Sequence, residues 1–347
     1  MKNKSFEHPG GFHSSAQLEI SRNKVALREQ PWLAAYESLM KEATGNLDRP
    51  SEAMEDFSVP GYYKDAEGHR IMMGRLGRDA WTAYSCAIAY QVTSGAARNK
   101  FADKAVRTLS SWSSINRKTS NHDGDLAMAD AGSGLLFAAE LLSDYGGWTD
   151  GQRMEFRSWL ENVYLESCSK ISVRPNNWGD WGNLGCIASH YFLDDAGGID
   201  ADIERIRNRI GEAIAPDGSM PHETCRGNNG IWYTYFALAP LTSASQIALN
   251  SRGVDLFHYK CEAGYGIEHA LDYLLKYSRE PGTWPHYIGK DLNIPRPGKW
   301  PGNLFEAMSG IYGRKDYEDW IIEARPIMYF GHHYTWSTPT LLRTVGS

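Results

Sequence analysis

Apolar residues recur every three or four positions in one window after another along the 347-residue chain. This spacing places apolar side chains on one face of an α-helix. Strict alternation of apolar and polar residues, which marks half-buried strands, is nearly absent. The pattern predicts helices over residues 14–27, 31–43, 77–95, 97–113, 125–147, 149–168, 181–193, 202–214, 232–253, 256–278 and 304–314.

Two of these helices carry a capping box at their start, Ser14 to Gln17 and Thr149 to Gln152. So many consecutive helices need partners, and a four-helix bundle would leave most of them unpaired. We therefore expect an all-α fold, an incomplete (α/α) toroid of about 10–14 helices with a deep cleft, in a single domain over residues 1–347.

Two long segments interrupt the helical pattern. Residues 50–73 form a polar and aromatic stretch that we expect to be a lid loop, and residues 279–303 are rich in Pro, Gly and basic residues. Loops at one end of a toroid line its cleft. We expect Lys290 and Arg296 to contact an anionic ligand there, with a solvated surface loop as the alternative.

Composition excludes several classes of function. The net charge of −6 argues against a nucleic-acid partner, although a locally basic cleft can still bind an anion. No apolar run reaches the ~18 residues of a membrane span, so no membrane partner is expected. The 12 Trp and 19 Tyr residues suit a cleft that stacks on sugar rings. The five cysteines show no metal-ligand spacing.

The stretch DGSMPHETCRGNNGIWYTYFALAPL (217–241) places polar and aromatic residues directly before an apolar helical run. Arg226 and Tyr233 are seven residues apart, two turns of helix, so both side chains can project the same way. A salt bridge between Arg226 and Glu223 is the purely structural alternative. The same stretch offers four more candidate ligand-contacting residues, His222, Glu223, Trp232 and Tyr235.

The stretch RPNNWGDWGN (174–183) sets two adjacent amides, Asn176 and Asn177, beside two indoles, Trp178 and Trp181. Amides hydrogen-bond a carboxylate without adding charge, and indoles stack on sugar faces. The alternative is a turn anchored by tryptophans.

Histidines occur in two other places of interest. His122 precedes the helix at 125–147 in a segment that lacks a third metal ligand, which favours a helix-entry loop. The pair His332–His333 is expected to be partly satisfied at the surface.

Together the two stretches resemble the alginate lyases of polysaccharide lyase family five. RPNNWGDW is similar to that family's Asn-Asn-His-x-x-Trp motif, and the stretch from residue 217 is similar to its Leu-Pro-x-Glu-x-x-Arg-Gly segment and the helix that follows. HPGGFHSSAQLEISRNKV, RDAWTAYSCAIAYQVTSG and AVRTLSSWS also match the family's general pattern. The resemblance runs over most of the chain and implies a toroid that cleaves a 1,4-linked polyuronate by β-elimination.

Carried over to this chain, the resemblance implies that Asn177 neutralises the substrate carboxylate, with Arg226 near it. Tyr233 would be the acid and base, because the step of seven residues from the arginine is kept. The loop with Tyr62 and Tyr63 would form a lid over the cleft.

The chain departs from the family pattern at two positions. Trp178 stands where the family has the motif histidine, and Trp232 replaces the histidine before the catalytic tyrosine. These departures suggest a related family on the same fold, such as family thirty-eight, which cleaves mannuronan or glucuronan. His222 and His122 are the candidates to replace the motif histidine, His222 first because it shares the Arg226 segment.

The implied chemistry removes a weakly acidic proton from C5, which requires neutralisation of the adjacent carboxylate. A tyrosine base needs its pKa lowered from ~10, and Arg226 is the expected cation. In β-mannuronate and β-glucuronate the C5 proton and O4 lie on one face, so Tyr233 could serve both. The scheme requires no metal or cofactor.

Two other functions stay open. A toroidal glycoside hydrolase would need two carboxylates about 5–10 Å apart, and the candidates are Asp180, Glu223, Asp123 and Asp125. A non-catalytic polysaccharide-binding protein is the second alternative. In each case the expected partner is an anionic polysaccharide, the protein is expected to be a monomer, and we expect a secreted or periplasmic location with a leader removed.

Overall fold

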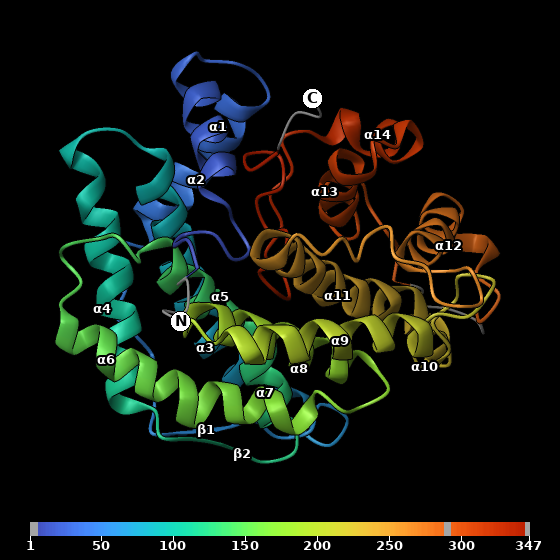
Figure 1. Ribbon diagram of the computed structural model, residues 1–347, viewed down its shortest axis with the longest axis horizontal. Helices are drawn as coiled ribbons and strands as arrows, with labels where there is room; N and C mark the ends of the chain where they lie inside the picture. The colour runs from blue at the N-terminus through green and yellow to red at the C-terminus, as the bar shows by residue number, and fades with distance from the viewer. Residues whose placement is uncertain (1–5, 288–292, 344–347) are drawn as a thin grey trace.

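The computed structural model describes residues 6–287 and 293–343, and within them nearly all regular secondary structure is helical (Figure 1). This confirms the all-α prediction. The helices are α1 (Ser15–Ala26), α2 (Trp32–Gly45), α3 (Ala66–Val92), α4 (Asn99–Ile115), α5 (Gly124–Leu141), α6 (Asp150–Trp159), α7 (Leu165–Ile171), α8 (Asn177–Phe192), α9 (Ala196–Ala213), α10 (Pro221–Thr224), α11 (Gly230–Arg252), α12 (Ile267–Arg279), α13 (Gly302–Tyr312) and α14 (Lys315–Ile321).

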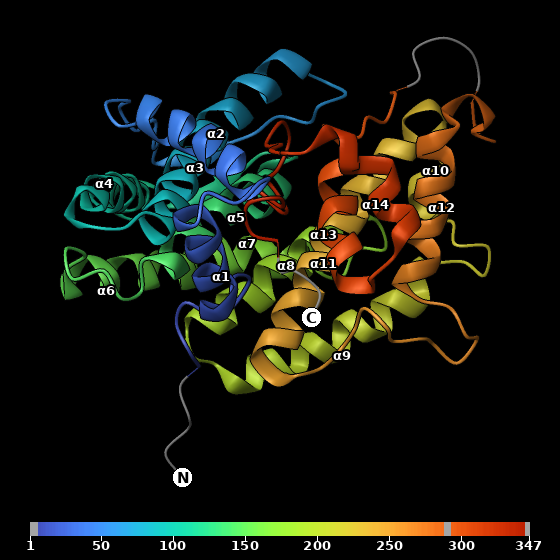
Figure 2. The same ribbon diagram turned by 90° about the horizontal axis from the view of Figure 1, so that it is seen from above.

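Four helices form an inner row in which each packs on the next: α3 on α5, α5 on α8, and α8 on α11. Other helices cover this row from outside, α4 against α3, α7 and α9 against α8, and α12 against α11. In Figures 1 and 2, α4 and α6 lie at one end of the molecule and α10 and α12 at the other. This is the expected (α/α) toroid.

The position of a helix in this arrangement explains its sequence pattern. The inner helix α5 has small or apolar residues on nearly every face, and all its residues from Ala127 to Leu141 are buried. The outer helices α4 and α12 keep one polar face, as helices with a single buried side do. Buried apolar side chains form one cluster that runs from Phe12 to Leu342.

Helix starts follow the predicted capping signals in part. Thr149 and Gln152 form the full capping box at α6, and the Ser14 side chain accepts from the Gln17 N–H at α1. At α3 the prediction of a loop through residue 73 is wrong. The Asp65 side chain accepts from the Gly68 N–H and starts the helix at Ala66.

The α12 helix also differs from the prediction, which began it at residue 256. Residues 256–266 are irregular, and the helix begins at Ile267. Gly264 adopts a positive φ of 86°, a conformation that ends regular helix and that glycine accepts without strain.

A short parallel sheet joins the segment before α3 to the segment before α5. Strand β1 (Asp56–Ser58) pairs with β2 (Lys118–Ser120), with Phe57 opposite Thr119. The sheet extends to the loop that follows β1, because the Val59 N–H donates to the Ser120 carbonyl and the Asp123 N–H donates to the Val59 carbonyl. Two distant loops are thereby held beside each other.

Candidate active site

A cleft of about 1070 Å³ opens where α5, α8 and α11 begin. Its other walls come from α3, from the loop before α3 and from the segment 330–334 near the C-terminus. The predicted residues that line it are Tyr62, Tyr63, His122, Asn176, Asn177, Trp178, Arg226, Trp232 and Tyr233. The fold thus brings together the two stretches that the sequence singled out.

Three other predicted contact residues are buried beneath the cleft and do not line it. Trp181 packs against Phe236, and the Tyr235 hydroxyl donates to the Asn303 side chain at 3.0 Å. Tyr235 follows the cleft-lining Tyr233 by two residues, which turns its side chain away from the cleft on a helix. The prediction that Trp181, Tyr235 and Glu223 contact a sugar is therefore wrong in this structure.

His222 and Arg296 are exposed outside the cleft. His222 lies beside the buried Glu223 on the single turn of α10, and adjacent residues of a helix face different ways. His222 therefore does not replace the motif histidine, contrary to our first choice. Lys290 lies outside the described residues. Among the described residues of the 279–303 loop, Asn293 and Trp300 line the cleft.

The buried Glu223 carboxylate accepts two hydrogen bonds from Asn177. The Asn177 backbone N–H donates to one Glu223 carboxylate oxygen at 2.6 Å, and the side-chain Nδ2 donates to the other at 2.7 Å. Burial raises the pKa of Glu223 to about 7 against the opposing effect of these two donors. The Asn177 amide keeps one N–H that Glu223 does not use.

Tyr233 lies between a cation and a second phenol. The guanidinium carbon of Arg226 is 5.0 Å from the Tyr233 ring centre, and the Tyr233 and Tyr63 hydroxyls are 3.1 Å apart. Burial and the Tyr63 contact raise the pKa of Tyr233, while Arg226 lowers it by less. The expectation of a lowered pKa therefore does not hold for the unliganded site.

Asp123 binds two histidines at the start of α5. Its carboxylate oxygens lie 2.6 Å from His122 Nδ1 and 3.1 Å from His69 Nδ1, and one accepts the Tyr62 N–H at 2.9 Å. Burial raises the pKa of Asp123, but these hydrogen bonds outweigh it and bring the pKa to about 2. The pKa of His69 is raised because its bonds to Asp123 and to the Pro60 carbonyl outweigh its burial. Sequence reasoning missed His69.

The pair His332–His333 is not a surface pair. His332 lines the cleft with its ring centre 5.1 Å from that of Trp232, and burial lowers its pKa. His333 is fully buried against Trp181 and Tyr235.

Three residues of the cleft carry buried polar atoms that find no hydrogen-bond partner within the described residues: Asp130 Oδ1, Asn176 Oδ1 and Trp232 Nε1. Most buried polar atoms in proteins are paired, because an unpaired one keeps its desolvation cost. One acceptor, one donor and one carboxyl group are thus available to a ligand with hydroxyl groups.

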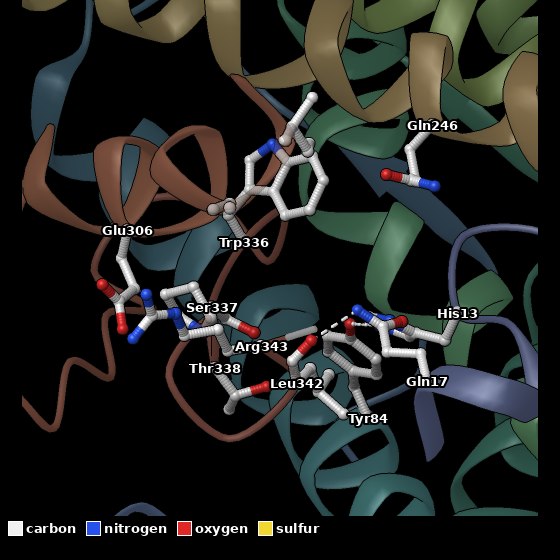
Figure 3. Close-up of a pocket in the computed structure, with 14 residues that line it drawn as sticks. His13, Gln17, Tyr84, Gln246, Glu306, Trp336, Ser337, Thr338, Leu342 and Arg343 are labelled. Carbon is white, nitrogen blue, oxygen red and sulfur yellow. Dashed lines mark hydrogen bonds between the residues drawn. The ribbon is translucent and has the colours of Figure 1, made fainter. Parts of the chain in front are cut away.

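A second cavity, of about 40 Å³, lies between the N-terminal segment and the C-terminal loop (Figure 3). His13, Tyr84 and Trp336 line it, and the His13 ring is hydrogen-bonded to the Tyr84 hydroxyl. Burial lowers the pKa of His13 to about 4. The cavity is large enough for water and too small for a sugar, and it shares no lining residue with the cleft.

The described residues contain no group of three or more His, Cys, Asp or Glu side chains arranged to hold a metal ion. None of the described helices combines the length and apolar character needed to cross a bilayer.

Solved structures of alginate lyases share this toroid. The enzyme from Bacteroides ovatus aligns with a TM-score of 0.74 at 17% identity, over 92% of this chain and 96% of that one. A tyrosine-to-phenylalanine variant of alginate lyase A1-III, complexed with a tetrasaccharide, aligns with a TM-score of 0.79 at 16% identity over 98% and 97% of the two chains. Alginate lyase A1-III from Sphingomonas species A1 gives 0.73 at 17% identity over 98% and 97%. At these identities the likeness establishes the fold alone.

The sequence matches the alginate lyase family over residues 29–284, and the chain belongs to that family. This confirms the resemblance of its motifs. A polysaccharide lyase from Stenotrophomonas maltophilia (strain K279a) is 28% identical over 141 residues. That match covers 40% of this chain and 41% of the relative, so the chain spans about two fifths of the length of the curated relative it matches.

Proposed function

We propose that this protein is a polysaccharide lyase that cleaves a 1,4-linked polyuronate, either polymannuronate or glucuronan, by β-elimination. The observation that carries the proposal is the convergence of Tyr233, Arg226, Asn177 and His122 on one cleft. Membership of the alginate lyase family and the lyase relative support the reaction class.

The charge of the cleft supports an anionic substrate. Five basic residues line it although the chain as a whole has a net charge of −6: Lys64, Arg70, Arg78, Arg174 and Arg226. Arg70 and Arg78 are paired with Glu67 and Glu52, whereas Lys64, Arg174 and Arg226 form no ion pair with a carboxylate of the described residues. Two acidic residues line the cleft: Asp123, which is already bound to two histidines, and the buried Asp130. A concave site with a local excess of cations concentrates a polyanion whatever the total charge.

The first requirement of the reaction is neutralisation of the uronate carboxylate, so that charge can flow onto it when the C5 proton leaves. The free N–H of Asn177 and the guanidinium of Arg226 supply donors. His122 takes the place of the family's motif histidine in this proposal, because it lines the cleft and Asp123 fixes its ring.

The second requirement is proton transfer. The Tyr233 phenolate accepts the C5 proton, the electron pair forms the C4=C5 double bond, the C4–O4 bond breaks, and the Tyr233 phenol returns the proton to O4. The raised pKa of Tyr233 favours the acid half of this cycle. Arg226 favours the phenolate, and the Tyr63 hydroxyl gives its proton a route to solvent because Tyr63 is 74% exposed.

The carboxylates named for a hydrolase are less suitable. Both oxygens of Asp180 accept from Arg209 at 2.8 Å, and Asp125 accepts from the Thr119 hydroxyl at 2.6 Å. Among Asp180, Asp125, Glu223 and Asp123, only Asp123 lines the cleft. These four therefore do not supply the pair of carboxyl groups that hydrolysis needs on either side of a glycosidic bond.

Ultraviolet absorbance of the purified protein mixed with polymannuronate, polyguluronate and glucuronan, each with and without chelator, tests the proposal. We expect absorbance from the new C4=C5 bond with polymannuronate or glucuronan, unaffected by chelator. New reducing ends without absorbance would establish hydrolysis instead. Binding without any product would establish a polysaccharide-binding protein.

A further inference from the structure

One face of α5 forms part of the cleft wall. Asp123, Leu126, Ala127, Asp130 and Ala131 all line the cleft, and their spacing places them on one side of the helix. Asp130 lies two turns beyond Asp123, about 10 Å along the helix axis. Neither the proposed carboxylate contacts nor the Tyr233 chemistry uses Asp130.

The Asp130 carboxyl group has no partner within the described part of the chain. Asp130 is only 3% exposed, Oδ1 is fully buried, and neither carboxyl oxygen takes part in a hydrogen bond or ion pair with the described residues. The one hydrogen bond at this residue goes from the Ser133 hydroxyl to the Asp130 main-chain carbonyl, at 2.6 Å.

Three tyrosines lie close enough to Asp130 for its charge to raise their pKa values, but none donates a hydrogen bond to its carboxyl group. Each hydroxyl proton goes to another oxygen: Tyr164 donates to the Ala129 carbonyl, Tyr235 to the Asn303 side chain, and Tyr334 to the Gly77 carbonyl. Burial therefore raises the pKa of Asp130 well above its usual range, with no cation of the described residues opposing it. A raised pKa favours the neutral carboxyl group, and the neutral form offers one O–H donor and one carbonyl acceptor.

The part of the cleft beside Asp130 is aromatic. Trp81 and Phe330 stack with ring centres 4.1 Å apart, and the Trp81 and Tyr334 ring centres are 6.0 Å apart. All three rings line the cleft. Aromatic walls beside a neutral donor–acceptor pair match a sugar ring, which presents an apolar face and vicinal hydroxyl groups.

We propose that the Asp130 carboxyl group binds the C2 and C3 hydroxyls of one uronate unit, donating to one and accepting from the other, and so discriminates between mannuronate and glucuronate. The two sugars differ in the orientation of the C2 hydroxyl, so one carboxyl cannot fit both pairs equally well. The inference rests on the proposed lyase function. Asp130 is in this view a specificity-determining residue, which touches substrate away from the bond that breaks.

The variants Asp130→Leu and Asp130→Asn test this, with Ser133→Ala as a matched control on the same helix. Asp130→Leu loses both hydrogen bonds, so we expect KM on the preferred polymer to rise about tenfold with kcat changed less than about twofold. Asp130→Asn keeps a donor and an acceptor and should restore KM to within about threefold. The preference between polymannuronate and glucuronan should shrink in Asp130→Leu and persist in Ser133→Ala.

Two further measurements separate binding from structure. Asp130→Leu should raise the Tm, because it removes an unpaired buried polar group. Glu223 contributes a protonated-carboxyl infrared band to the parent protein and the variants alike. The spectrum of the parent protein minus that of either Asp130 variant should therefore retain such a band from Asp130, and this band should shift when an oligouronate is added.

Unchanged KM and unchanged preference in Asp130→Leu would overturn the inference, as would a lower Tm with kcat and KM lost together. If the parent protein eliminates none of the polymers, the lyase proposal fails. Calorimetric titration with oligouronates then still tests Asp130: equal affinity of the parent protein and Asp130→Leu overturns this inference alone.

Discussion

The Tyr63 hydroxyl lies 3.1 Å from the Tyr233 hydroxyl, although the two residues are 170 positions apart. Tyr63 belongs to the loop before α3 and Tyr233 to the first turn of α11. The exposed Tyr63 phenol thus contacts Tyr233, the residue to which we assign proton transfer. This contact raises the pKa of Tyr233.

Tyr233→Phe should lower kcat by about 10²- to 10⁴-fold with little change in KM, because it removes the group that moves the proton and leaves the carboxylate contacts. The rate of absorbance increase on the preferred polymer measures this. Tyr235→Phe is the matched control. It loses one buried hydrogen bond, with a cost of about 1 kcal/mol in stability, and should keep kcat. Near-normal turnover by Tyr233→Phe would exclude the proposed role.

Tyr63→Phe should move the rise of kcat/KM with pH to lower pH. The Tyr63 hydroxyl raises the pKa of Tyr233, so its removal lets the phenolate form at a lower pH. The measurement is a kcat/KM profile between neutral and alkaline pH for both proteins. A profile that stays in place or moves to higher pH would show that Tyr63 does not control the ionisation of Tyr233.

Asp123→Asn should lower kcat/KM about 10- to 100-fold, because charge-assisted hydrogen bonds to both His69 and His122 are lost. The pKa of His69 should fall, since Asp123 is a main cause of its elevation. Proton NMR titration of the histidine rings follows this directly. An unchanged His69 pKa would mean that the Asp123 contact does not persist in solution.

Glu223→Gln should change the pH dependence of stability. The pKa of Glu223 is raised from 4.5 to about 7 in the folded protein, so between these values the folded state binds a proton that the unfolded state has lost. Stability from this group is therefore full below pH ~4.5 and falls as pH rises towards 7, by about 3 kcal/mol. The fall in stability between pH 5 and pH 7.5, measured by denaturant unfolding, should be smaller in Glu223→Gln than in the parent protein by most of this amount, because other groups with a raised pKa, such as Asp130, contribute equally to both.

The sequence predicted the fold because the outer helices α4 and α12 keep one polar face, while the inner helix α5 is a long run of small and apolar residues without strand-like alternation. It also predicted that Arg226 and Tyr233 meet, although the chain between them is not continuous helix: a 3₁₀ turn at Gly227–Asn229 precedes α11. A step of seven residues keeps two side chains on one side even across such a turn.

Other site residues could not be predicted because the contacts that define them are distant in sequence. His69 gains its role from Asp123, 54 positions away, and Asp130 lies in a run of small residues typical of any buried helix. Trp181 and Tyr235 were misplaced for a different reason. The residue type shows that a tryptophan or tyrosine can contact a sugar. Its angular position around the helix axis decides whether its side chain faces the cleft or the core.

The pairing of β1 with β2 has a consequence for engineering. The strand that precedes the tyrosine loop is bonded to the strand that precedes His122, and the Tyr62 N–H is bonded to Asp123. The β1–β2 sheet and the Tyr62–Asp123 hydrogen bond therefore position both Tyr63 and His122. Exchanging residues 56–65 for the loop of a relative without exchanging 118–123 as well would misalign Tyr63 and His122 relative to each other, so the two segments should be transplanted together.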